Sequence, residues 1–278
     1  MYKHFTILAL AAIMLSCTQQ PVTLTILHTN DTHSQVEPID KGVKNGDCGG
    51  YARRMGLIAQ EREKDPELLL FDAGDFCQGT PYFNIYKGDI EIDAINRMKY
   101  DAVTLGNHEF DNGVDTLAAK LKKLQCPVVC ANYVVENTPL QDIVKPYTIL
   151  YRKGLKIGVF GLGVNPKGLI TDVNFSPLQY LDPIETGNKT ATMLKNQEKC
   201  DVVICLSHIG TIQKDGIPCD STLIKSAKDI DLVIGGHTHM LFENHFVTDQ
   251  DNDSILSVQM QKSGVYVGKV QLTIEEIE

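Results

Sequence analysis

The chain has 278 residues, of which 43% are hydrophobic, so it is long enough for one large globular domain or two small ones. Its formal net charge of -9 argues against nucleic-acid polymers as the main partner, because such partners usually require a basic face. A small anionic substrate is still compatible with this charge, because a metal site supplies positive charge locally.

The beginning of the chain predicts an export signal. Lys3 precedes an apolar stretch over residues 5–15, which is shorter than the roughly 20 residues that span a bilayer. A small serine before Cys17 resembles a bacterial lipobox, which predicts that Cys17 is lipidated and becomes the new N-terminus. An ordinary cleaved signal peptide is the alternative. We expect a signal peptide over 1–16, a linker over 17–20, and a periplasmic or outer-membrane-associated lipoprotein whose only membrane contact is the lipid.

The rest of the chain alternates strand-like and helical patterns. Apolar residues recur at helical spacing in two places, at Tyr51, Met55 and Ile58 and at Leu117, Leu121 and Leu124. Seven short apolar runs have the character of strands: Val22–Leu27, Leu68–Phe71, Ala102–Leu105, Val128–Ala131, Leu155–Leu162, Val202–Leu206 and Leu232–Ile234. This alternation predicts a layered α/β fold in one domain over 21–278.

Three further segments complete the expected organisation. Residues 265–274 alternate in polarity near their end, which predicts an exposed strand with one buried face. Residues 139–146 and 165–183 are expected to be long loops. Seven cysteines follow Cys17 without a CxxC pair: Cys48, Cys77, Cys126, Cys130, Cys200, Cys205 and Cys219. We interpret them as free thiols, with one or two disulfides as the alternative, and expect none to bind metal.

Five strand-like runs end in a polar cluster, within "ILHTNDTH", "LLLFDAGD", "AVTLGNHE", "VVICLSHIG" and "LVIGGHTH". In α/β sheets, ligands gather outside the carboxyl ends of the strands, and burying so many unpaired polar groups in a core would be costly. The candidate metal ligands are Asp31, His33, Asp75, Asn107, His208, His237 and His239. In "DTH" and "HTH" the i, i+2 spacing places both side chains on one face of an extended backbone.

The chemistry of these groups predicts two divalent metal ions. Carboxylate oxygens and imidazoles together suit zinc, manganese or iron better than calcium. Seven ligands exceed what one tetrahedral ion takes, but they fit two ions if one carboxylate bridges them.

These motifs resemble those of a known family. The order D-x-H, G-D, G-N-H-E, a lone His after a strand, and G-H-x-H is similar to the signature of the calcineurin-like metallophosphoesterases. The stretches "NDTHSQVEP", "GGYARR", "GDFCQGTPYF", "GNHEFD" and "GGHTH" resemble the 5′-nucleotidase (UDP-sugar hydrolase) branch of that family, in its N-terminal catalytic domain. The resemblance covers nearly all of residues 21–278 and implies a four-layer α-β-β-α sandwich with the metals at the strand ends.

The resemblance also implies roles for single residues. One metal would be held by Asp31, His33, Asp75 and His239, and the other by Asp75, Asn107, His208 and His237, with Asp75 as the bridge. His108 would be the catalytic imidazole that faces the substrate phosphate, with Asp111 orienting it and raising its pKa. Asn107 and His108 would both contact the substrate.

The expected activity is hydrolysis of phosphate esters, most of all nucleoside 5′-monophosphates, by attack of a metal-bridging hydroxide on phosphorus. Related activities stay open: UDP-sugar hydrolysis, 2′,3′-cyclic nucleotide phosphodiesterase activity and thiosulfohydrolase activity. A non-catalytic metal-binding surface lipoprotein is the alternative of another class. The pairing of His108 with Asp111 argues against that alternative, because metal binding alone does not require it.

Typical secreted 5′-nucleotidases continue into a second domain that stacks the base and grips the substrate. We therefore expect either a separately encoded 5′-nucleotidase C-terminal substrate-binding domain as a partner, or a broad phosphatase. Other polar residues are expected to be structural. Glu109 should cap backbone amides, and His28 and His245 should be non-catalytic. Arg53 and Arg54 are expected to form salt bridges near a helix start, with an approach to the substrate phosphate as the alternative.

Overall fold

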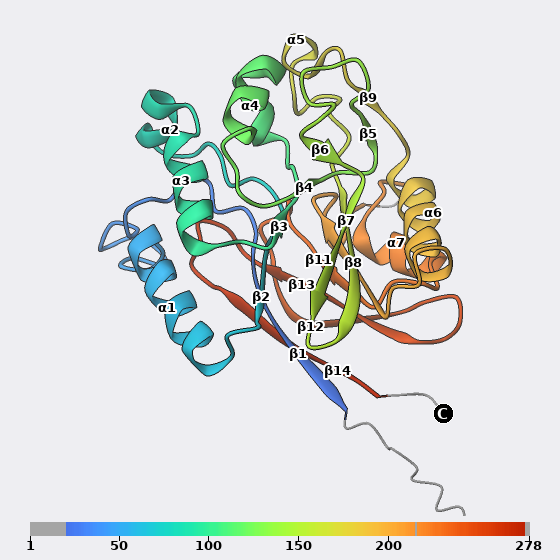
Figure 1. Ribbon diagram of the computed structural model, residues 1–278. Coiled ribbons are helices and arrows are strands. Elements are labelled where there is room, and N and C mark those ends of the chain that lie inside the picture. The colour runs from blue at the N-terminus through green and yellow to red at the C-terminus, as the bar shows by residue number, and fades with distance from the viewer. Residues whose placement is uncertain (1–20, 215, 276–278) are drawn as a thin grey trace, which may run out of the picture.

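The computed structural model describes residues 21–214 and 216–275, and Figure 1 shows two sheets lying between two groups of helices. The first sheet has the order β14-β1-β2-β3-β4-β6. Its strands are β1 (Val22–Thr29), β2 (Leu69–Asp72), β3 (Ala102–Val103), β4 (Val128–Val129), β6 (Val144–Lys145) and β14 (Gly268–Ile274). Residues 1–20, which include the predicted signal peptide, linker and Cys17, lie outside the described residues.

The second sheet has the order β12-β13-β11-β10-β8-β7. Its strands are β7 (Tyr147–Arg152), β8 (Leu155–Leu162), β10 (Val202–Ser207), β11 (Leu232–Ile234), β12 (Leu241–Thr248) and β13 (Ser254–Met260). A small antiparallel pair is formed by β5 (Tyr133–Val134) and β9 (Gln179–Tyr180). The helices are α1 (Tyr51–Lys64), α2 (Pro81–Tyr86), α3 (Asp89–Met98), η1 (His108–Phe110), α4 (Gly113–Leu121), α5 (Asp172–Phe175), α6 (Pro183–Asn196) and α7 (Asp220–Ser226).

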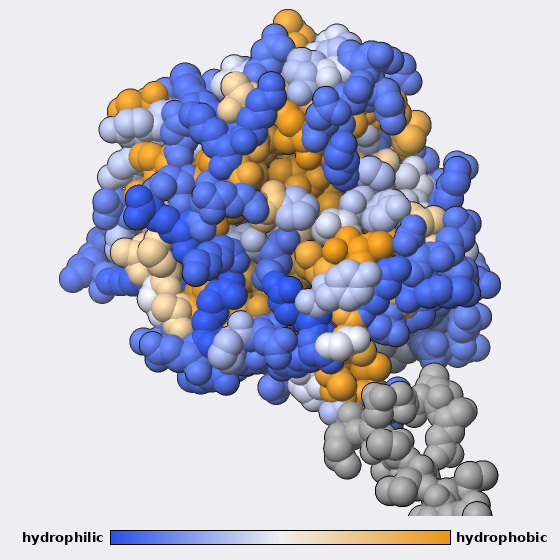
Figure 2. Space-filling model, viewed as in Figure 1, coloured by the Kyte–Doolittle hydropathy of each residue, from blue (hydrophilic) through white to orange (hydrophobic). Residues whose placement is uncertain are grey.

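Three apolar cores separate four layers. Side chains of both sheets, including Ile26 and Ile204, meet in the central core. A second core joins the first sheet to α1, α3 and α4, and a third joins the second sheet to α6 and α7. The face of the molecule that Figure 2 shows is mostly hydrophilic, with apolar patches among the hydrophilic side chains. The arrangement is the predicted four-layer α-β-β-α sandwich.

Most strands within each sheet run parallel, so their carboxyl ends meet at a common edge. The parallel set is β1, β2, β3, β4 and β6 in the first sheet, and β8, β10, β11 and β13 in the second. Antiparallel strands close the edges at β14, β7 and β12. This common edge is where ligand-binding residues are expected in α/β proteins.

Several predicted details need correction. The two long loops were wrong in part, because 139–146 contains β6, and 165–183 contains both α5 and β9. The predicted strands at 102–105 and 128–131 are confirmed only at their first two residues, as β3 and β4. The exposed strand near the end is confirmed as β14. All seven cysteines after Cys17 are free, and no helix of the described residues is long and apolar enough to cross a membrane.

Candidate metal centre

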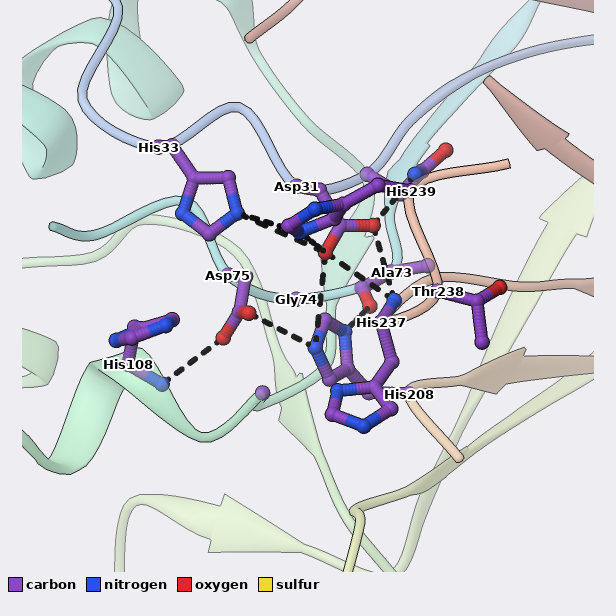
Figure 3. A network of polar contacts seen from close by, with 12 residues as sticks. Asp31, His33, Ala73, Gly74, Asp75, His108, His208, His237, Thr238 and His239 are labelled. Carbon is purple, nitrogen blue, oxygen red and sulfur yellow. Dashed lines mark hydrogen bonds and ion pairs between the residues drawn. The ribbon is translucent and has the colours of Figure 1, made fainter. Parts of the chain in front are cut away.

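The predicted ligand residues meet at the common edge of the two sheets. Figure 3 shows that they arrive from separate segments: the loop after β1, the loop after β2, and the segments after β10 and β11. Their potential ligand atoms form two sets, and in each set these atoms lie within 4.8 Å of one another. The sets are Asp31, His33, Asp75 and His239, and Asp75, His208 and His237. Asp75 is common to both, so its carboxylate can bridge two cations.

Asn107 joins this centre from the first sheet. The amide N–H of the next residue, His108, donates to Asp75 Oδ1 at 2.9 Å, which ties the Asn107 segment to the shared carboxylate. Asn107 Oδ1 is buried and has no hydrogen-bond partner among the described residues. A buried oxygen without a partner is costly, and a cation would satisfy it.

The backbone at the ligands is strained in a way that the sequence spacing did not predict. Asp31, His33, Asp75, His237 and His239 have φ between 46° and 74°, in the left-handed region that non-glycine residues seldom adopt. The extended backbone assumed for "DTH" and "HTH" was therefore wrong. Such conformations persist only where the surroundings hold them, and they gather at functional sites.

Tertiary hydrogen bonds hold these strained loops in place. The amide of Asp31 donates to Gly74 O at 2.9 Å, and the amide of His33 donates to Asp75 O at 3.0 Å. The Asp31 carboxylate accepts from the amide of His237 at 3.0 Å and from Asn30 Nδ2 at 2.6 Å. The loops after β1, β2 and β11 therefore fix one another.

Gly74 is required where these loops meet. It has a φ of 88°, and a Cβ there would lie 2.6 Å from the amide nitrogen of Gly106 and 2.9 Å from His208 Nδ1. A side chain at this position would push His208 and the Asn107 segment away from the centre.

The imidazole of His208 is aimed by a hydrogen bond from its other nitrogen. His208 Nδ1 lies 2.6 Å from Ala73 O, so Nδ1 carries the proton and donates it. Nε2 is then left facing Asp75 Oδ2 at 3.1 Å, in the arrangement by which proteins orient a metal-binding histidine.

The charges of this centre favour cations. Burial lowers the pKa of His208, but the carboxylates of Asp75 and Asp31 outweigh that effect and raise it to about 10. Burial acts to raise the pKa of Asp75, but His208, His33 and His108 hold it well below its usual range. A divalent cation would take the place of the proton between these groups. The residues present therefore fit two divalent cations with mixed oxygen and nitrogen ligands.

His108 borders the centre without belonging to either set. It begins η1, and its ring centroid lies 5.4 Å from that of His33. His108 Nδ1 lies 2.9 Å from Asp111 Oδ2, and both side chains are about one-third exposed. Burial lowers the pKa of His108, but the hydrogen bond to Asp111 and the charge of Asp75 outweigh it, so the pKa is raised.

The physical reason for separating His108 from Asn107 needs correction. The prediction assumed extended backbone, in which neighbouring side chains point to opposite faces. Asn107 has φ -78° and ψ -31°, which is right-handed helical backbone. In α-helical and 3₁₀-helical backbone, successive side chains are rotated by about 100–120°. The two side chains still diverge, but by that smaller angle.

Glu109 caps backbone amides, as predicted, and links its own segment to the loop after β2 and to the end of the segment after β3. Its Oε2 accepts from the amides of Asp75 at 2.9 Å and Gly106 at 2.6 Å, and its Oε1 accepts from the amide of Cys77 at 3.0 Å. Burial and the charge of Asp75 raise the pKa of Glu109 to about 8. Glu109 therefore positions Asp75 through the backbone.

We expect Glu109→Gln to lower the free energy of unfolding by about 1–3 kcal/mol, because the Nε2 group of Gln cannot accept a hydrogen bond and leaves at least one buried backbone amide unpaired. Thermal denaturation followed by circular dichroism should show a fall in Tm of about 2–4 °C per kcal/mol. Glu63→Gln, on the exposed side of α1, is the matched control. Equal Tm values for the two variants would contradict the role given to Glu109.

The remaining predicted polar residues lie away from the metal centre, and one of them, Arg54, is not placed as predicted. Arg53 forms the expected ion pair, with Asp47 at 2.8 Å. Arg54 does not: it is buried, and its guanidinium carbon lies 5.2 Å from the centroid of the Tyr51 ring. The prediction for Arg54 was wrong, because α1 turns this side chain into the core. The buried ring of His28 packs against Gly268.

Residues that the sequence did not single out also line the hollow beside the centre. Gln78 and Gly79 follow β2, and Lys262 and Ser263 lie in the turn between β13 and β14. They share this hollow with His33, His108 and His239. The only sequence signal for the second pair was a short polar stretch, "QKSG", between two strands.

A model of the calcineurin-like phosphoesterases matches residues 24–241. The chain belongs to this family. It is similar to the snake venom 5′-nucleotidase of Naja atra, with 33% identity over 276 residues that cover 91% of the chain and 50% of that relative. It is also similar to the trifunctional nucleotide phosphoesterase protein YfkN of Bacillus subtilis, with 32% identity over 91% of the chain and 18% of that relative. These matches confirm the resemblance to the 5′-nucleotidase branch that was seen in the motifs.

Solved structures of the family share the fold. The 5′-nucleotidase precursor from Thermus thermophilus matches with a TM-score of 0.80 and 31% identity, over 91% of this chain and 52% of that one. The chain thus spans about half the length of the Naja and Thermus relatives. The metallophosphoesterase therefore corresponds to one part of these longer proteins.

Proposed function

We propose that this metallophosphoesterase hydrolyses nucleoside 5′-monophosphates, releasing a nucleoside and inorganic phosphate with the uptake of one water molecule. The observation that carries the proposal is the pair of ligand sets that share Asp75 beside His108. Names of several relatives include 5′-nucleotidase, which favours nucleotides among the possible phosphate esters.

The residues of the chain divide the work. The two ligand sets and Asn107 would hold the divalent cations, of zinc, manganese or iron. Two such cations, when bound, supply positive charge for a phosphate and make a water molecule more acidic. The His108 imidazole lies at the rim of the first set, where it can donate a hydrogen bond to a phosphate oxygen or a proton to the leaving oxygen. Asp111 keeps the ring oriented for that task.

The hollow beside the centre bears on how a base would be recognised. Among the described residues that line it, the aromatic side chains are all histidines, namely His33, His108 and His239, and the other lining residues are Gln35, Gln78, Gly79, Lys262 and Ser263. Stacking a base requires an aromatic or guanidinium plane. We therefore propose that selectivity for the base comes from a 5′-nucleotidase C-terminal substrate-binding domain.

We expect the purified chain, supplied with manganese or zinc, to release phosphate from AMP, and a chelator to abolish that activity. A panel of phosphate monoesters, UDP-glucose, 2′,3′-cyclic AMP and an organic thiosulfate distinguishes the activities of the family. The metal content of the same protein sample is measured alongside. Addition of the C-terminal domain should lower the KM for AMP more than the KM for p-nitrophenyl phosphate. If the metal-loaded protein acts on none of these compounds, the non-catalytic alternative is favoured.

A further inference from the structure

A groove leads away from the metal centre along the turn between β13 and β14. Its inner part, of about 230 Å³, borders His33 and His108. Its outer part, of about 380 Å³, reaches Lys44 on the loop before α1. The two parts share Gln35, His239, Lys262 and Ser263 in their walls. Lys262 therefore lies between the catalytic rim and the outer groove.

The turn that carries Lys262 is held firmly against the metal centre. The amide of Ser263 donates to Asp31 O at 2.7 Å, and Asn30 Nδ2 donates to Gln261 O at 2.8 Å. Gln261 and Ser263 have φ of 52° and 61°, so both neighbours of Lys262 occupy the left-handed region. Strained backbone that is held in this way presents the intervening residue in a defined position.

The buried guanidinium group of Arg54 packs against the turn between β13 and β14. Arg54 packs against Gly264, where an added Cβ would lie within 3 Å of its guanidinium. The Nε and Nη2 atoms of Arg54 are buried and have no hydrogen-bond partner among the described residues. Arg54 thus adds positive potential beneath the turn and keeps Gly264 free of a side chain.

The groove is positively charged in a chain that is negative overall. Lys262 and Lys44 are exposed, and neither forms an ion pair with another described residue. No aspartate or glutamate is among the described residues that line either part of the groove. With a formal net charge of -9 for the whole chain, two unpaired lysines in a groove without acidic residues favour an anionic ligand.

We propose that Lys262 is a specificity-determining residue, which binds a second phosphate of the substrate while the first phosphate lies at the metal centre. Lys44 provides further positive charge for the same group at the outer end of the groove. This inference rests on the proposed function, since it assumes a phosphate at the metal centre. An ammonium group and a phosphate form a charge-assisted hydrogen bond, although solvent and salt weaken it at an exposed site.

The test compares AMP, which has one phosphate, with ADP, which has the same nucleoside and two. In Lys262→Met we expect the ratio of the KM for ADP to the KM for AMP to rise about fivefold to tenfold, the size of a modest charge-assisted contact. The rise should shrink as salt is added. The kcat for ADP should change less than its KM, because the lysine contacts the phosphate that leaves with the nucleoside and not the phosphorus atom that is attacked.

Lys228→Met is the matched control. Lys228 is also exposed, but it follows α7 and precedes β11, at the amino-terminal edge of the strands, opposite the metal centre. It should leave the KM ratio as in the unmodified protein. If Lys262→Met leaves the ratio unchanged while AMP is still hydrolysed, the inference about Lys262 is overturned and the proposed function stands. If the unmodified, metal-loaded protein hydrolyses neither nucleotide, the proposed function fails and this inference fails with it.

Discussion

His108→Ala should lower kcat by about 10²- to 10⁴-fold while the protein keeps both metal ions, because general acid–base groups contribute about this much to rate. The side chain of His108 belongs to neither ligand set. Its backbone amide, which donates to Asp75 Oδ1, is still present in the variant. Metal binding and catalysis should therefore separate at this residue.

The measurement pairs steady-state kinetics with metal content by mass spectrometry on the same sample. Asp111→Asn serves as an intermediate, because an asparagine oxygen can still accept from His108 Nδ1 while the negative charge is lost. It should reduce kcat less than His108→Ala does. A His108→Ala protein that is as active as the unmodified protein, or one that has lost its metal, would show that His108 does not have the role given to it.

The fold was predictable from the sequence wherever apolar runs were long or regular. The buried parallel strands β8, β10 and β11 are nearly continuous apolar runs, and each was predicted within one residue of its ends. Short strands were less clear, because β6 has only Val144 as a buried apolar residue. The α3 helix was missed, although Ile92, Ile95 and Met98 are spaced three residues apart along one buried face.

The residues of the candidate site could be predicted from the sequence, but their backbone conformation and their relative positions could not. The motifs named Asp31, His33 and His239, yet their left-handed backbone depends on hydrogen bonds with residues far away in sequence. The assignment of residues to two sets came from the family resemblance. The position of Lys262 could not be predicted from the sequence. Its turn, between β13 and β14, meets the loop after β1 only when β14 pairs with β1.

Arg54 shows a different limit of the sequence. A charged residue near a helix start is usually exposed, so an ion pair was the natural expectation. Neighbouring Arg53 meets that expectation with Asp47, while Arg54 lies one helical step further round and points into the core. Which of two adjacent arginines faces inward depends on how α1 is rotated against the sheet.

Asp75→Asn should remove both metal ions and reduce kcat by about 10³-fold or more, because two cations contribute several kcal/mol to the stabilisation of transition-state charge. Asp75 is the single residue present in both ligand sets. Asparagine retains an oxygen for the amide of His108, so the loss should reflect the missing charge and the missing second oxygen. His239→Ala and His237→Ala each alter one set and should each lose one metal ion.

His245→Ala is the control for the histidine variants. His245 lies on β12 with Nε2 3.1 Å from Ser221 Oγ, and it is in neither ligand set. It should retain two metal ions and full activity.

Metal content after dialysis distinguishes the outcomes for Asp75→Asn and the histidine variants, and circular dichroism verifies that each variant is folded. If Asp75→Asn retained one ion as firmly as His239→Ala does, Asp75 would belong to a single metal site, and the two sites would be independent. Loss of both ions from Asp75→Asn, with one retained in each histidine variant, is the pattern that only a shared carboxylate produces.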